Sequence, residues 1–116
     1  MLSRDAILQM DDLPRELVKV PEWGGDVYVS TLTGTSRDSF EQSMQGKKNK
    51  LNLDNVRARF AVLTLVDDKG VRLFTDADAK LLGEKAAAAL DRVFAVAQRL
   101  NGFSDSDAQE IIAGNS

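Results

Sequence analysis

Carboxylates are the main groups in this sequence that could do acid–base chemistry at neutral pH, because it contains neither His nor Cys. The usual zinc and copper sites, and Ser-His or Cys-His catalysis, are excluded for the same reason. Asp76 and Asp78 follow Thr75 at the spacing of a capping box, and acids are favourable in the first turn of a helix. We therefore interpret this pair as a helix cap and predict no catalytic, cofactor or metal site.

A second acidic cluster, Asp67-Asp68-Lys69-Gly70, has some of the residues of a calcium loop. The calcium-binding helix–loop–helix pattern needs oxygen ligands at alternate positions and a Glu at the twelfth. Counted from Asp67, the third residue is Lys69 and the twelfth is Asp78, and the Gly comes too early. The cluster is therefore predicted to be a turn.

A basic run, Lys47-Lys48-Asn49-Lys50, offers contact with phosphate or with an acidic partner, and Arg57 and Arg59 follow it closely. The run has no interleaved aromatic residues, so a solvated connector is the favoured interpretation. The net charge of −3 also lacks the basic balance of a nucleic-acid binder. We predict no nucleic-acid partner.

The length of 116 residues predicts a single domain, residues 1–116. A hydrophobic content of 43% and a charged content of 28% are ordinary for a soluble globular protein. The longest uninterrupted apolar stretches, residues 86–90 and 93–97, are far too short to span a membrane. Residues 1–12 do not have the pattern of a secretory signal, so a soluble protein of the cytoplasm is expected.

The elements that must position any functional residue start with a β-hairpin over residues 18–32, within a hairpin region 15–33. Alternating Val residues flank a connection that contains Gly24-Gly25 and the only Trp of the chain, Trp23. Such a connection predicts a bulged or wide loop. An isolated hairpin is marginal in water, so it must pack against something else.

The remaining chain, residues 35–113, is predicted to be mainly helical. Ser3 is the expected cap of a helix anchored by Ile7 and Leu8, and Thr35 or Ser36 of another. The expected helices cover residues 4–10, 36–45, 54–66, 75–83, 84–100 and 104–113. The fold class is therefore α+β, with an N-terminal β-hairpin packed on a mainly α-helical body.

Residues 60–66 allow two interpretations. Leu53, Val56, Phe60 and Leu63 share one helical stripe, which favours a helix through Val66. The rival has residues 60–66 as a strand that turns at residues 67–70 and pairs with residues 71–74. Helical spacing in the preceding residues favours the first interpretation, but short apolar runs do not settle the choice by periodicity.

The strongest helical prediction is residues 84–100. Its apolar residues fall within a sector about 120° wide, as a core-facing helix requires. Val96 and Ala89 widen that sector to one side and indicate a second contact. The apolar residues are Ala86, Leu90, Val93, Phe94, Ala97 and Leu100.

Several blocks along the chain resemble the tail assembly chaperones of long-tailed bacteriophages and prophages, of the HK97/lambda-like kind. Their order and spacing carry the resemblance more than any one block, and they cover about residues 3–107. The blocks are residues 3–8 (SRDAIL), 12–14 (DLP), 18–29 (VKVPEWGGDVYV), 37–41 (RDSFE), 56–59 (VRAR), 67–75 (DDKGVRLFT), 82–90 (LGEKAAAAL) and 100–104 (LNGFS).

The resemblance implies a non-catalytic role. Such chaperones bind the tape-measure protein, keep it soluble, help recruit major tail protein around it and are shed before the virion is complete. Many have a longer form made by ribosomal frameshifting, and residues 111–116 are where such an extension would attach. The implied location is the cytoplasm of the bacterial host. The alternative function is a small structural virion component, such as a head–tail adaptor.

Two surfaces would suit such a role. Helices with thin Ala surfaces offer a groove for an amphipathic helix. A free hairpin edge offers strand addition by a partner, and equally self-association. The candidate contact residues are Trp23, Tyr28, Val29, Val96, Ile111 and Ile112.

Overall fold

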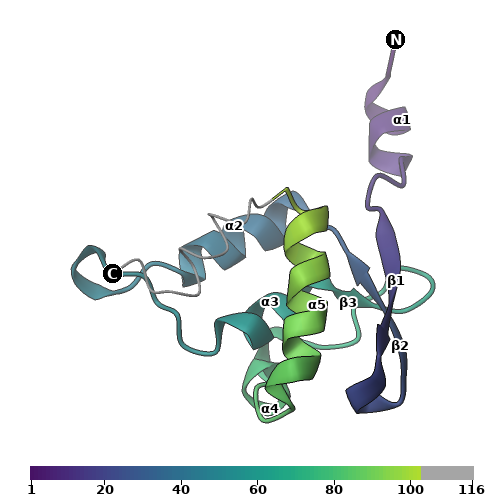
Figure 1. The fold of residues 1–116 in the computed structure, drawn as a ribbon. Helices are drawn as coiled ribbons and strands as arrows, with labels where there is room; N and C mark the ends of the chain where they lie inside the picture. The colour runs from purple at the N-terminus through teal and green to yellow at the C-terminus, as the bar shows by residue number, and fades with distance from the viewer. Residues whose placement is uncertain (103–116) are drawn as a thin grey trace.

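The computed structural model describes residues 1–102, which form a three-stranded sheet packed against helices (Figure 1). The α+β fold class is confirmed. The predicted helix at 104–113, with Ile111 and Ile112, lies outside the described residues. The described elements are α1 Arg4–Gln9, β1 Arg15–Val20, the 3₁₀ turn η1 Pro21–Trp23, β2 Gly25–Ser30, α2 Gly34–Ser43, η2 Lys47–Asn49, α3 Val56–Thr64, β3 Leu65–Val66, η3 Asp76–Asp78, α4 Ala79–Leu82 and α5 Ala87–Leu100.

The predicted hairpin is confirmed as β1 and β2, which pair antiparallel with Val18 opposite Val27. Gly24, at φ 70°, closes the η1 turn, where a left-handed backbone favours glycine. Val18, Val20 and Val29 are buried and belong to the main hydrophobic core. The hairpin is therefore one wall of the core, because alternation turns these valines towards the helices.

In residues 60–66, each of the two interpretations is correct for one part of the segment. The helix α3 ends at Thr64, and Leu65–Val66 form β3, which pairs antiparallel with β2. Val66 also bridges to Arg72 across the turn at residues 67–70, as in the rival interpretation. The prediction of a helix through Val66 is thus wrong at its last two residues. The backbone groups at the edge of β2 form hydrogen bonds with Leu65 and Val66, which therefore leave the helix. The periodicity of apolar residues in the segment carries no information about that distant strand.

The helix α5 packs against β1 and β2 and lies beside α3 (Figure 1). It begins at Ala87, three residues later than predicted, and buries Ala89, Leu90, Val93, Phe94 and Ala97. The rings of Phe40 and Phe60 have centroids 4.8 Å apart, and those of Phe60 and Phe94 5.6 Å apart. Phe60 therefore joins α2, α3 and α5 in one aromatic cluster, an arrangement that adds to simple burial.

The caps of α1 and α2 compare differently with the sequence predictions: the first is the predicted residue and the second is not. Ser3 caps α1 as predicted, since its Oγ accepts from the Ala6 backbone N–H at 3.1 Å. Ile7 and Leu8 do not anchor that helix: they are 55% and 66% exposed. At α2 the cap is Thr33 rather than Thr35 or Ser36, because Thr33 Oγ1 accepts from the Ser36 backbone N–H at 3.0 Å.

Polar contacts fasten the hairpin to α5. Arg92 Nε lies 2.8 Å from Glu22 Oε1, and Arg99 Nη2 lies 2.6 Å from Glu16 Oε2. The hydrogen bond from Arg92, and a second one from the backbone N–H of Glu22 itself, lower the pKa of the Glu22 carboxyl below its ordinary value of 4.5. These contacts join η1 and β1 to α5.

Candidate protein-binding surface

A groove opens beside the hairpin turn, where three separate segments meet. Trp23 comes from η1, Leu73 and Phe74 from the segment after β3, and Leu81 and Leu82 from α4. Asp78 and Lys85 complete the lining, and the volume of the groove is about 590 Å³. We call this feature the Trp23 groove.

The Trp23 groove has the properties of a site for apolar side chains. Leu81 is 69% exposed and Leu73 is 49% exposed, whereas Leu82 is buried and forms the floor. Trp23 is half-buried and packs against the core. Binding sites for ligands and proteins are commonly concave and apolar, which makes the groove the candidate site.

Asp78, which lines the groove, and its neighbour Asp76, which does not, both have local partners. Asp78 accepts hydrogen bonds from Thr75, from the backbone N–H at 2.8 Å and from Oγ1 at 3.2 Å. Asp76 pairs with Arg72 at 2.8 Å. The capping interpretation of Asp76 and Asp78 thus agrees with these contacts. Within residues 1–102 there is no group of three or more His, Cys, Asp or Glu placed to hold a metal ion.

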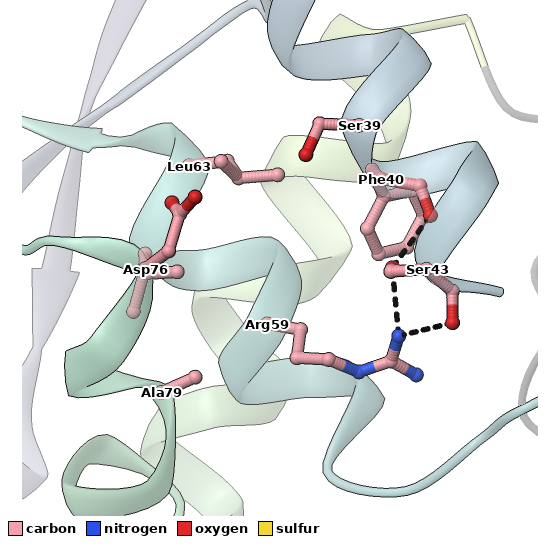
Figure 2. Close-up of a pocket in the computed structure, with 8 residues that line it drawn as sticks. Ser39, Phe40, Ser43, Arg59, Leu63, Asp76 and Ala79 are labelled. Carbon is pink, nitrogen blue, oxygen red and sulfur yellow. Dashed lines mark hydrogen bonds between the residues drawn. The ribbon is translucent and has the colours of Figure 1, made fainter.

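A second, smaller cavity of about 130 Å³ lies between α2 and α3 (Figure 2). Arg59 reaches along it and donates from Nη1 to Ser43, to the backbone O at 3.0 Å and to Oγ at 2.7 Å. Its other nitrogens donate to the carbonyls of Asp54 and Asn52. Burial lowers the pKa of the Arg59 guanidinium. The hydrogen bonds to Ser43, Asn52 and Asp54 hold this group against the protein.

These contacts give structural roles to Arg57 and Arg59, the two arginines that follow the basic run. Arg59 holds the loop between α2 and α3 in place, and Arg57 pairs with Asp91 of α5 at 2.6 Å. Both guanidinium groups serve the fold, so they do not add to a phosphate-binding surface with residues 47–50. The spacing of residues in the sequence does not reveal that a long charged side chain will reach backbone carbonyls.

The structure separates the candidate contact residues predicted from the sequence. Trp23 lines the groove, and Val96 is half-buried against the core. Val29 is 0% exposed and points into the core, so it is not accessible in the folded chain. Tyr28 lies on the opposite face of the sheet from Val29, with the Arg15 guanidinium 5.8 Å from its ring centroid. These residues do not form one patch.

Sequence reasoning missed most of the Trp23 groove. Leu81-Leu82 in a short capped helix was the available signal, because a four-residue helix cannot bury both members of an adjacent pair on one face. Leu73 gave no signal of its own. Trp23 precedes Leu73 and Leu81 by about 50 to 60 positions in the sequence, and only folding brings the three together.

The described chain is a small α+β protein with an exposed apolar groove on its surface. Comparison with family models gives a specific assignment: residues 3–112 match the model of the phage tail assembly chaperones, and the chain belongs to that family. The solved structure of the bacteriophage HK97 tail assembly chaperone is similar, with a TM-score of 0.63 and 18% identity over 88% of this chain and 94% of that chain. At this identity the likeness shows a shared fold. No curated protein matches the sequence.

The family resemblance and the hairpin-plus-helices fold expected from the sequence are both confirmed. In the described part of the chain, no helix is long and apolar enough to cross a membrane. The family assignment rests on nearly the whole chain, whereas the binding surface rests on the geometry of the groove.

Proposed function

We propose that this protein is a non-catalytic tail assembly chaperone that acts in the cytoplasm of the bacterial host. It binds the tape-measure protein and helps to recruit major tail protein around it. Family membership supports the role, and the exposed apolar Trp23 groove supports the mode of binding. The groove is the observation that carries the proposal, because a holding chaperone must cover apolar surface on its client.

The chemistry of the groove suits an amphipathic helix. Such a helix presents apolar side chains at positions i, i+3, i+4 and i+7, which enter a groove as a row of anchors. Trp23 and Leu81 offer large apolar contact surfaces, and Asp78 and Lys85 offer one charge of each sign for polar residues beside the stripe. An aromatic residue in a partly buried pocket is a typical centre of binding energy.

Co-expression with the tape-measure protein of the same phage tests the proposal. The wild-type chain should raise the soluble fraction of that client and co-purify with it. Leu81→Asp places a charge in the groove and should abolish both effects. Leu17→Asp is the matched control: Leu17 is 54% exposed, but it lies on β1 outside the groove.

Three results would contradict the proposal. If the wild-type chain neither co-purifies with the client nor changes its solubility, the chaperone role fails. If Leu17→Asp and Leu81→Asp behave alike, the groove is not the client site. A structural virion role predicts the chain in purified particles, so its detection there by mass spectrometry would overturn the assembly-factor assignment.

A further inference from the structure

Asn101 and Gly102 form the one Asn-Gly pair of the sequence, and they directly follow α5. Such a pair is labile in an unfolded chain, because the backbone N of the second residue can attack the side-chain carbonyl carbon of the Asn. Glycine hinders this attack least, since it has no Cβ. The other described Asn residues precede bulkier side chains, in Asn49-Lys50, Asn52-Leu53 and Asn55-Val56. The end of α5 therefore carries the most reactive of these pairs.

The chemistry of the pair is deamidation, which has two steps. In the first, the Gly102 backbone N forms a bond to Cγ of Asn101, while the bond from Cγ to Nδ2 breaks. Ammonia leaves with the proton of the Gly102 N–H, and a five-membered succinimide ring remains. In the second step, water adds to one of the two ring carbonyl carbons and opens the ring. The products are aspartate and isoaspartate, in which the main chain runs through the former side chain.

The folded structure holds the reacting groups apart. Asn101 Oδ1 accepts from the Leu32 backbone N–H at 2.7 Å, and Nδ2 donates to the Ala97 carbonyl at 2.8 Å, so the amide is held at both ends. The Gly102 backbone N–H donates to the Arg99 carbonyl at 3.3 Å. Ring closure also needs Asn101 Cβ and the Gly102 N on the same side of the Cα–C bond, and the observed ψ of 8° keeps them apart.

These contacts form a local lock between the end of α5 and the connection from β2 to α2. Arg37 of α2 completes it, because its Nη1 donates to the Asn101 backbone O at 3.1 Å. Asn101 is only half-buried and Gly102 is exposed, so water reaches the pair. Helix ends open at a lower free energy than the whole fold does, since fewer contacts hold them. Opening of this end alone is enough to release both reacting groups.

We propose that Asn101-Gly102 is a deamidation site controlled by the fold. While the lock is closed, the pair is protected. When the end of α5 leaves the β2–α2 connection, the succinimide can form. The modification thus records each such opening as a permanent chemical change in the chain. This inference does not rest on the proposed chaperone function.

Deamidation also prevents the lock from closing as before. Aspartate lacks the Nδ2 donor for the Ala97 carbonyl and places a negative charge at the C-terminus of α5, where the helix dipole is unfavourable to it. Isoaspartate adds a carbon to the main chain and shortens the side chain that reaches Leu32. Both products therefore leave the end of α5 more open than it was in the unmodified chain.

Tandem mass spectrometry of the whole protein after incubation at neutral pH tests the proposal. Incubation in water enriched in oxygen-18 labels each newly formed carboxylate. The urea-unfolded chain should deamidate at Asn101 and stay unmodified at Asn52 and Asn55. The folded chain should deamidate at Asn101 at least about tenfold more slowly. An isoaspartate-specific methyltransferase should label the product, and the separated deamidated protein should melt at a lower temperature than the unmodified protein.

Two variants separate local opening from global unfolding. Arg37→Ala removes the hydrogen bond to the Asn101 carbonyl and should speed deamidation of the folded chain about three- to tenfold. Val29→Ala weakens the core without removing a contact of Asn101, and is the matched control. Its rate should stay within about twofold of wild type, because opening of the α5 end does not need the core to unfold.

Four results would overturn the proposal. If the urea-unfolded chain keeps Asn101 intact, the pair is not a deamidation site. Equal rates in the folded and unfolded chains would show that the fold does not control it. A larger acceleration in Val29→Ala than in Arg37→Ala would assign the reaction to global unfolding. A deamidated protein that melts with the unmodified one would show that the lock survives the modification.

Discussion

Asn101 joins the end of α5 to the connection between β2 and α2, and its replacement should weaken the fold. Its side-chain Oδ1 accepts from the Leu32 backbone N–H at 2.7 Å, and its Nδ2 donates to the Ala97 carbonyl at 2.8 Å. Its backbone O also accepts from Arg37 Nη1 at 3.1 Å. Asn101→Ala removes the two side-chain bonds and leaves the last one available.

The size of the expected loss of stability follows from the backbone N–H of Leu32. Its partly buried N–H loses its acceptor, and an unsatisfied buried donor costs about 1 to 3 kcal/mol. The unfolding entropy expected for 116 residues converts each kcal/mol into about 4 °C. We therefore expect Asn101→Ala to lower the melting temperature by about 4 to 12 °C.

Differential scanning calorimetry and urea titration measure this change. Gln42→Ala, at an exposed position of α2, is the control and should leave the melting temperature nearly unchanged. A loss of less than about 0.5 kcal/mol for Asn101→Ala would refute the reasoning, because the Leu32 N–H would then be satisfied without Asn101.

Asn101→Asp gives a second measurement at the same site. The carboxylate still accepts from Leu32, but it also places negative charge beside the Ala97 carbonyl and the C-terminus of α5. It should destabilise the fold at neutral pH. The difference from wild type should narrow in acid, where the protonated group can donate to Ala97. A difference that is independent of pH would contradict this account.

Two further predictions concern the hairpin. Val29→Ala should lower the free energy of unfolding by about 2 to 3 kcal/mol in urea titration, because two methyl groups leave a position that is 0% exposed; a neutral result would mean that Val29 is not in the core. Glu22 has a lowered pKa in the folded state, so its contribution is present above the ordinary value of 4.5 and is lost as the pH falls through the folded value. The stability difference between wild type and Glu22→Gln should therefore shrink on acidification below about pH 4.5, and a growing difference would reverse the sign of the argument.

Local chemistry made several parts of this fold predictable. The Ser3 and Thr75 starts follow from side chains that satisfy nearby backbone groups. The alternation of Val18, Val20 and Val29 gave the buried face of the hairpin, and the spacing of apolar residues gave α5. In each case the cause and the effect lie within a few residues of one another.

Other features depended on residues far apart in the chain. Val29 was predicted to contact a partner, but α5 packs on its face of the sheet. Leu65 departs from the helical pattern because β2 pairs with it. Arg59 became a structural group because its helix turns it back onto backbone carbonyls of α2 and of the loop that precedes α3.

The sequence by itself determined most of the local elements, the α+β class and, through the order of its blocks, the family. Only the tertiary structure decided which apolar residues remain exposed. Burial depends on which surfaces meet, so Leu82 forms a floor while its neighbour Leu81 stays 69% exposed. The same reason leaves α1 uncovered and places Trp23 beside Leu73 and Leu81, in a groove that no local pattern encodes.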